Sequence, residues 1–307
     1  MRGLRWFGCL VLVAAFAACE EDVNPIVGTD LPFTFYGVLT PEADTQWVRV
    51  FPIEERLDPS TAPAIDAVVY STDQQTGERI PWTFRLLTAD DEGPLQTYGY
   101  FYWAAFRPAY GRSYRVDVER SDGRAAHATA AVPERSELEV LPMLTTQTST
   151  ARVLIRGRAD HFINVWLTFD IKYGVGEHEE QRLRRRFEGT LEQTADGWVL
   201  PINLGLAQNE IEEYLRDNQM WSNNYGVSLR RLSLRLLATD PAWDPPGDGP
   251  VFDPNVLVEP NQMTNVVNGF GFVGAGYSLA VDWLPEEELL LNAGFAVHAT
   301  DTTRAAL

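Results

Sequence analysis

Apolar and polar residues alternate with a period of two along most of this 307-residue chain. The clearest example is the run from Val165 to Tyr173, in which every second residue is apolar and the residues between are mostly polar. A period of two is that of a β-strand with one buried face, whereas an amphipathic helix repeats every 3.6 residues. The sequence therefore predicts a mainly β fold.

Seven short candidate strands, separated by turn residues, lie between residues 31 and 133. They cover 33–39, 47–53, 65–71, 80–87, 98–106, 112–119 and 124–132. This number and spacing of strands is typical of an immunoglobulin-like sandwich. Pro108 and Gly111 precede Tyr114, which opens an alternating strand. This arrangement is similar to the tyrosine corner of such sandwiches.

A second β-rich domain is expected over residues 137–284, after a boundary at Pro133-Glu134-Arg135-Ser136 and before a C-terminal tail over 285–307. The apolar parity changes between Val227 and Leu236, so a β-bulge is expected near Arg230-Arg231. One short helix is expected in this domain, because Asn209 and Glu212 form an N-cap pattern.

The N-terminus has the features of an export signal. Arg2 and Arg5 precede an apolar stretch of roughly a dozen residues, fewer than the roughly 20 that a membrane-spanning helix needs. The stretch ends in Ala17-Ala18-Cys19, which resembles the lipoprotein box. We expect residues 1–18 to be a bacterial lipoprotein signal peptide and Cys19 to carry lipid. A secretory signal cut near Ala18 and a retained anchor helix are the alternatives.

Residues 19–30 are expected to form an acidic tether. Glu20, Glu21 and Asp22 follow the cysteine directly, and they fit either a surface-export tag or a solvated, disordered linker. The chain as a whole has a formal net charge of −18. This charge argues against nucleic acid as a partner, because duplex binding depends on neutralising phosphates. It also argues against peripheral binding to anionic lipid.

The sequence contains no recognisable catalytic constellation, metal site or cofactor-binding motif. The four histidines are scattered. Gly269, Gly271 and Gly274 match GxGxxG, but the surroundings are β-patterned, so we interpret them as strand glycines that allow close backbone approach or a bulge. The acidic loop over residues 240–260 is interpreted as solvated, with calcium binding as the alternative.

Two candidate partner or ligand surfaces stand out. Tyr98, Tyr100 and Tyr102 share one strand face, which is either packed or free to bind a glycan or partner. Arg184 and Arg186 belong to the main basic cluster, which would either contact an anion or partner, or pair across the strands with glutamates. The glutamates in question are Glu177, Glu179 and Glu180.

The chain resembles Bacteroidetes-type envelope lipoproteins of unknown function, often described beside TonB-dependent receptors. The resemblance rests on Cys19, the strand 33–39, the corner around Tyr114 and the ending Asn265-Val266-Val267-Asn268-Gly269-Phe270-Gly271-Phe272-Val273-Gly274-Ala275-Gly276-Tyr277. It implies a non-enzymatic accessory lipoprotein, anchored in the outer membrane, with an envelope receptor as partner. A glycan- or peptide-binding lipoprotein is the alternative.

Overall fold

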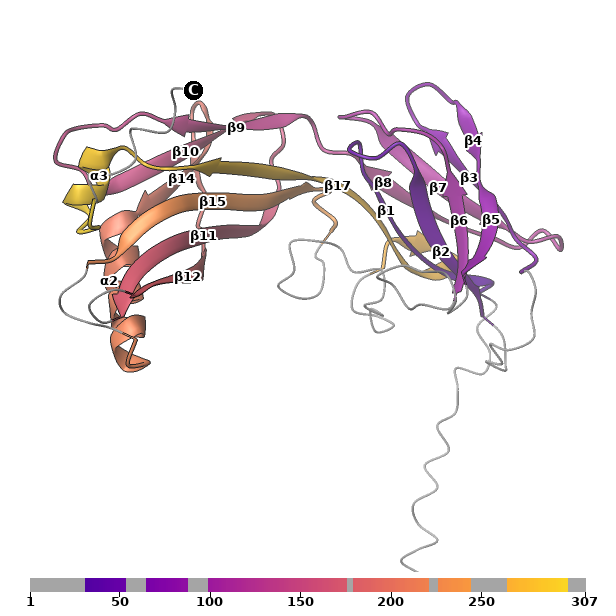
Figure 1. Ribbon diagram of the computed structural model, residues 1–307. Coiled ribbons are helices and arrows are strands. Elements are labelled where there is room, and N and C mark those ends of the chain that lie inside the picture. The colour runs from indigo at the N-terminus through magenta and orange to yellow at the C-terminus, as the bar shows by residue number, and fades with distance from the viewer. Residues whose placement is uncertain are drawn as a thin grey trace, which may run out of the picture.

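The computed structural model describes residues 31–53, 65–87, 99–175, 179–220, 226–243 and 264–297. The described chain is mainly β, with two β-rich modules side by side and two helices in the second module (Figure 1). The mainly β fold predicted from the period of two is therefore confirmed.

The first module is an immunoglobulin-like sandwich. One sheet has the order β1 (Phe33–Leu39), β2 (Gln46–Pro52), β6 (Gly99–Ala104) and β5 (Thr83–Leu87). The other has the order β8 (Ala125–Ala131), β7 (Ser113–Glu119), β3 (Val68–Asp73) and β4 (Arg79–Pro81). The first order corresponds to strands A-B-E-D of the immunoglobulin fold. Buried residues of both sheets, including Phe35, Val116 and Ala128, form one core.

The predicted strand over 80–87 is in fact two strands that belong to different sheets. The chain changes sheet at Trp82, between β4 and β5, and the indole Nε1 donates a hydrogen bond to the Ser71 hydroxyl at 3.1 Å. Trp82 is buried in the core of the sandwich. A single alternating pattern continues through the crossing, which is why the sequence predicts one strand.

The tyrosine corner is confirmed. Tyr114 lies at the start of β7, buried, and its phenolic oxygen accepts a hydrogen bond from the backbone N–H of Ala109 at 3.0 Å. This bond joins the new strand to the segment that leads from β6, as expected of a tyrosine corner between the fifth and sixth strands of an immunoglobulin sandwich.

Strand β17 (Gly269–Trp283) belongs to both modules. Residues 269–275 pair in parallel with β1, and residues 276–283 pair antiparallel with β15 (Ser228–Thr239). Just before it, β16 (Val266–Val267) pairs with β8, so this segment covers an edge of each sandwich sheet. The expected second domain over 137–284 therefore needs a correction: residues 266–275 complete the first module, and Val266, Val273 and Ala275 lie in its core.

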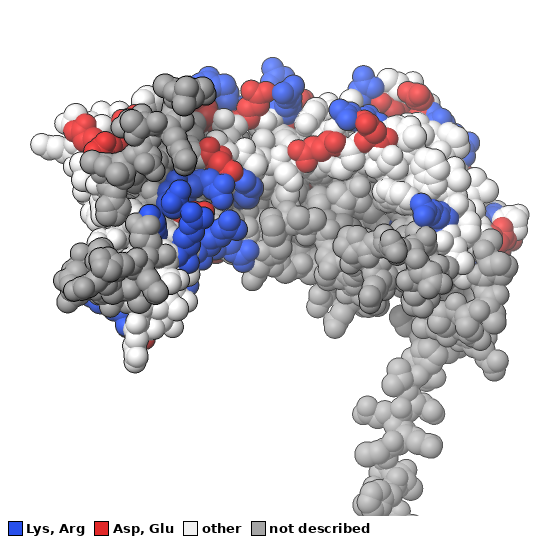
Figure 2. All heavy atoms as spheres, in the orientation of Figure 1, with Lys and Arg blue, Asp and Glu red and all other residues white. Residues whose placement is uncertain are grey.

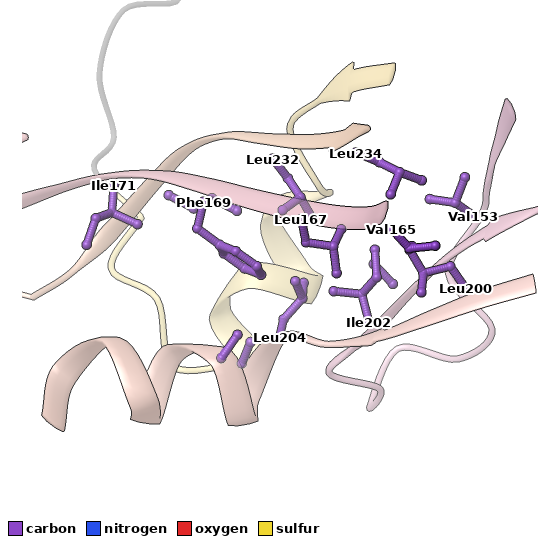
Figure 3. Close-up of a cluster of buried hydrophobic side chains, with 14 of the residues drawn as sticks. Val153, Val165, Leu167, Phe169, Ile171, Leu200, Ile202, Leu204, Leu232 and Leu234 are labelled. Atoms are coloured by element: carbon purple, nitrogen blue, oxygen red, sulfur yellow. The ribbon is translucent and has the colours of Figure 1, made fainter. Parts of the chain in front are cut away.

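The second module packs two layers around its own core. One layer is the remainder of the eight-stranded sheet: β12 (Glu179–Glu188), β11 (Phe162–Val175), β15 and the second half of β17. The other is a four-stranded sheet of β13 (Glu192–Thr194), β14 (Gly197–Asn203), β10 (Thr150–Gly157) and β9 (Ser136–Leu141). Figure 3 shows side chains of β10, β11, β14, β15 and the first helix meeting in this core.

A β-bulge in β15 is confirmed at the predicted place. Asp170 of β11 is opposite Arg231, but the next residue, Ile171, is opposite Leu229. Arg230 is thus the extra residue. The bulge restores the parity of β15, so that Leu229 and Leu232 both reach the core.

Helix α2 (Leu204–Asp217) begins earlier than predicted. Its N-cap is Asn203, whose side-chain oxygen accepts a hydrogen bond from the Leu206 N–H at 3.0 Å, so Asn209 lies within the helix. Ile211 and Leu215 lie on the buried face of this helix. The expected tail also contains a second helix, α3 (Glu287–Asn292). Because Leu289, Leu290 and Phe295 are buried in the second core, the segment to residue 297 is part of the module.

Candidate interaction surfaces

The exposed side of the second module's large sheet carries a cluster of basic residues, called here the basic face. Strands β11 and β15 bury one parity in the core, β12 packs Leu183 and Phe187 partly against it, and the other parity of all three strands is partly or fully exposed. Figure 2 shows the Lys and Arg atoms gathered over these three strands. The basic face consists of Lys172, Arg182, Arg184, Arg186, Arg231 and Arg235.

Cross-strand register brings these side chains together. Asp170 on β11 lies opposite both Arg184 on β12 and Arg231 on β15. The carboxylate is 3.9 Å from Arg184 and 3.5 Å from Arg231. Both arginine side chains remain largely solvated, and exposed ion pairs of this kind contribute little to stability. One aspartate shared between two guanidinium groups leaves this part of the sheet positively charged.

Further carboxylates neutralise the basic face only in part. Arg235 forms an ion pair with Asp282 of β17 at 2.8 Å, and this hydrogen-bonded guanidinium lowers the pKa of the Asp282 carboxyl. The guanidinium of Arg186 lies 4.0 Å above the Trp166 ring. Stacking on an aromatic ring holds an arginine in place without removing its charge. The face therefore combines fixed positive charge with one aromatic side chain.

The glutamates that the sequence offered as cross-strand partners are not opposite the arginines. Glu179 and Glu180 begin β12 itself and pair with Val175 and Gly174, and Glu177 lies outside the described residues. Arg184 and Arg186 instead face Asp170 and Thr168. Backbone register therefore places Glu179 and Glu180 at the turn end of the hairpin, on the same strand as Arg184 and Arg186 and not across from them.

The sequence missed the other members of the basic face. Arg231 and Arg235 lie on β15, about 50 residues further along the chain than the cluster on β12. Their membership depends on β15 pairing with the opposite side of β11. The one sequence feature that indicates an outward-facing Arg235 is parity, because Arg235 lies between the buried Leu234 and Leu236.

The tyrosine surface is largely a packed face. Tyr102 is 3% exposed, and its hydroxyl donates a hydrogen bond to the Ala67 carbonyl at 3.0 Å. Burial raises the pKa of Tyr102 to about 12. Tyr100 is half-buried beside Phe84, with ring centroids 6.1 Å apart, and Tyr98 lies outside the described residues. Tyr102 is therefore a core residue, so the prediction that it lines a ligand surface is wrong.

The opposite face of this sheet carries, among the described residues, one exposed aromatic side chain, Trp47 of β2. Trp103 of β6 pairs with Trp47 of β2, and their ring centroids are 6.3 Å apart. Trp47 is 38% exposed. Arg49, the next residue on this face of β2, lies over the Phe51 ring at 4.4 Å. This arrangement places one exposed ring, Trp47, beside the half-buried ring of Trp103 and near the cation of Arg49.

The GxGxxG glycines serve the close backbone approach that the sequence predicts. A Cβ on Gly269 would meet the Phe33 carbonyl oxygen at 2.6 Å, and one on Gly271 would meet that of Phe35 at 2.1 Å. Gly271 also has a φ of +105°, in the region that favours glycine. All three motif glycines lie in β17. The GxGxxG match therefore reflects the close packing of this strand against its neighbours.

Asp240, the first aspartate of the acidic loop, has a structural role. It is buried, and its carboxylate accepts hydrogen bonds from the backbone N–H of Ala131 at 2.7 Å and of Ala242 at 2.9 Å. The other aspartates of the calcium alternative lie outside the described residues, as does Cys19. Within the described ranges, His, Cys, Asp and Glu form no group of three or more that would suit a metal ion.

Among the described helices, neither is long and apolar enough to cross a membrane. No protein-family model matches the chain, and no curated protein matches it significantly.

Proposed function

We propose that this chain is a non-enzymatic, lipid-anchored protein of the cell envelope that acts as an accessory or interaction module. The signal that ends in Cys19 supports the anchor. The outer membrane is the proposed location, and a TonB-dependent receptor is the proposed class of partner, both from the resemblance of the N-terminus and the closing motif.

The observation that carries the interaction function is the basic face. A chain with a net charge of −18 concentrates exposed cations on one side of one sheet. Random placement on such an acidic chain would intersperse the two signs, whereas a single-sign patch attracts an oppositely charged partner and orients its approach. The core lies on the other side of this sheet, so folding of the module does not require cations on the exposed side.

The anchor and the partner are tested separately. Cys19→Ser prevents lipidation, and we expect the chain to move from the membrane to the soluble fraction. For the partner, the lipidated chain is purified from native membranes in mild detergent, and co-eluting proteins are identified and quantified. A stoichiometric membrane barrel that is lost in the variant with Arg184→Glu and Arg186→Glu supports the proposal.

The matched control is the double variant with Arg135→Glu and Arg158→Glu, which makes the same change of charge at two exposed positions outside the basic face. Equal recovery of the barrel with all variants would refute a role for the basic face. An unchanged membrane association of Cys19→Ser would refute the lipid anchor.

Glycan binding is the second candidate function, and the exposed Trp47, which packs beside the half-buried Trp103, favours it. Flat aromatic rings with an adjacent cation are suited to stacking on sugar rings. Trp47→Ala should abolish retention on a polysaccharide affinity gel, while Tyr100→Ala, on the other face, should leave retention unchanged. Retention that survives Trp47→Ala would exclude this surface.

A further inference from the structure

Strand β12 forms one end of the eight-stranded sheet. Of the described strands, only β11 pairs with it, over ten residues from Glu179 to Glu188. Figure 1 shows β12 at the margin of the second module. An edge of this length presents a row of backbone N–H and C=O groups to any strand that approaches.

The side chains of β12 determine which strand the edge accepts. Arg182, Arg184 and Arg186 project on the basic face at every second position. A second copy of β12 paired with its basic face on the same side would place arginine near arginine, which destabilises pairing. A strand with carboxylates at every second position would place opposite charges side by side, which stabilises it. The edge is therefore protected against self-association but complementary to an acidic strand.

The other side of β12 is partly apolar. Leu183 and Phe187 are partly buried against the second core, and Phe187 contacts Phe169 edge-on with ring centroids 5.1 Å apart. Between them, Arg185 lies over the Tyr214 ring of α2 at 3.9 Å. An added strand would place its second set of side chains next to these groups. Apolar residues there would extend the hydrophobic layer.

We propose that the β12 edge is the docking site for an extended acidic segment of a partner protein, which joins the sheet as an additional strand. The segment alternates carboxylate residues, facing Arg182, Arg184 and Arg186, with apolar residues, facing Leu183 and Phe187. Main-chain hydrogen bonds provide the affinity in this mode of recognition, and alternate side chains provide the specificity. The inference deepens the proposed function, on which it rests, by defining the chemistry of the protein partner.

A protein segment fits this edge better than other polyanions. A polysaccharide or a lipid surface can neutralise arginines, but neither offers backbone N–H and C=O groups at the spacing of a β-ladder. The net charge of −18 also opposes close approach of the whole molecule to an anionic membrane. A narrow acidic strand that follows β12 lies beside Arg182, Arg184 and Arg186, with Glu188 as the one described carboxylate on the same face of this strand.

The test uses the full-length, lipidated chain in mild detergent and two fluorescent decapeptides of equal charge. One alternates Glu and Val, and the other alternates Glu and Pro, which cannot donate to a β-ladder. Anisotropy titrations at low and high salt give the affinities. We expect the Glu-Val peptide to bind at least tenfold more tightly than the Glu-Pro peptide, and to bind more weakly at high salt. Hydrogen exchange within residues 179–188 should slow when it binds.

Variants localise the effect. The double variant with Arg184→Glu and Arg186→Glu should weaken Glu-Val binding at least tenfold, and the charge-matched double variant with Arg135→Glu and Arg158→Glu should leave it unchanged. Equal affinity for the two peptides, or binding without slower exchange in β12, would overturn strand addition. Absence of binding at low salt would overturn docking at this edge. Displacement of the peptide by alginate or by anionic vesicles at equal charge would assign the basic face to those partners instead.

The exchange measurement on the unsubstituted protein decides the question even where a variant fails to fold. Loss of peptide binding alongside release of Cys19→Ser from the membrane would reject the acidic strand and leave the lipid-anchored role standing. Retention of Cys19→Ser on the membrane, with peptide binding intact, would reject the anchor alone.

Discussion

Tyr277 forms hydrogen bonds between the two stretches of chain that link the modules, β17 and the connection from β8 to β9. It lies on β17 just after the pairing changes from β1 to β15, and it is 4% exposed. Its hydroxyl accepts a hydrogen bond from the Ser136 N–H at 2.8 Å and donates one to the Glu134 carbonyl at 2.7 Å. Glu134 lies between β8 and β9, and Ser136 is the first residue of β9; this stretch is the other covalent link between the modules.

Tyr277→Phe should lower the free energy of unfolding by about 2 kcal/mol. Phenylalanine keeps the ring and its edge-on contact with Tyr110, at 5.0 Å between centroids. The buried N–H of Ser136 loses its partner, and leaving such a group unsatisfied costs about 1–3 kcal/mol. Glu134 is exposed, so water can replace the hydroxyl at its carbonyl, and this bond adds little.

Tyr173→Phe is the matched control, because it removes a hydroxyl from a tyrosine with similar burial. Tyr173 is 7% exposed, but its hydroxyl contacts only the Met220 sulfur at 3.7 Å among the described groups. Sulfur is a weak acceptor, so the expected loss is below about 0.5 kcal/mol. Urea unfolding, followed by tryptophan fluorescence, measures both variants against the parent chain. Equal midpoints for the two variants would show that the Tyr277 hydrogen bonds do not join the modules as argued.

Three further predictions test the first module. Gly271→Ala should lower the free energy of unfolding by more than about 3 kcal/mol in a thermal unfolding assay, because positive-φ strain adds to the close contact of the new Cβ with the Phe35 carbonyl. Gly77 also has a positive φ, but a Cβ there would meet nothing within 4 Å, so Gly77→Ala should cost only about 1 kcal/mol. Tyr114→Phe removes the tyrosine-corner bond and should lower the free energy of unfolding by about 1 kcal/mol in urea titrations. Burial raises the pKa of Tyr102 to about 12, from the ordinary value near 10, so the contribution of its neutral form to stability is fully present below pH 10. The free energy of unfolding, measured between pH 10 and pH 12, should therefore fall by up to about 1.4 kcal/mol per pH unit. This fall should be smaller in Tyr102→Phe.

Local patterns in the sequence were sufficient for much of the first module. Alternation located its strands, and the Pro108, Gly111 and Tyr114 spacing located the corner, because each of these features depends on residues close together in the chain. The bulge at Arg230 was predictable for the same reason: a change of parity within one strand requires an extra residue. Helix α2 was predictable as an element, but its start was not, since both Asn203 and Asn209 carry a side chain able to cap a helix.

Long-range pairing was not accessible from these patterns. The apolar residues of β17 alternate in the same way whether they pair with β1 or with β15, so nothing local indicates that the strand serves both modules. The prediction that Tyr102 lines a ligand surface was wrong for a related reason. Both faces of β6 are aromatic, and periodicity alone does not tell which of Tyr102 and Phe101 faces the sandwich core.

The basic face shows why an average charge is a poor guide to partners of a β-rich chain. Strands β12, β15 and β11 contribute three, two and one of its cations, and only the order of the sheet places them side by side. A net charge of −18 predicts repulsion of anions at distances where the whole molecule is sensed. Screening limits that repulsion to about 8 Å at physiological salt. At contact distance, an acidic strand at the β12 edge is therefore governed by Arg182, Arg184 and Arg186, not by the carboxylates elsewhere on the chain.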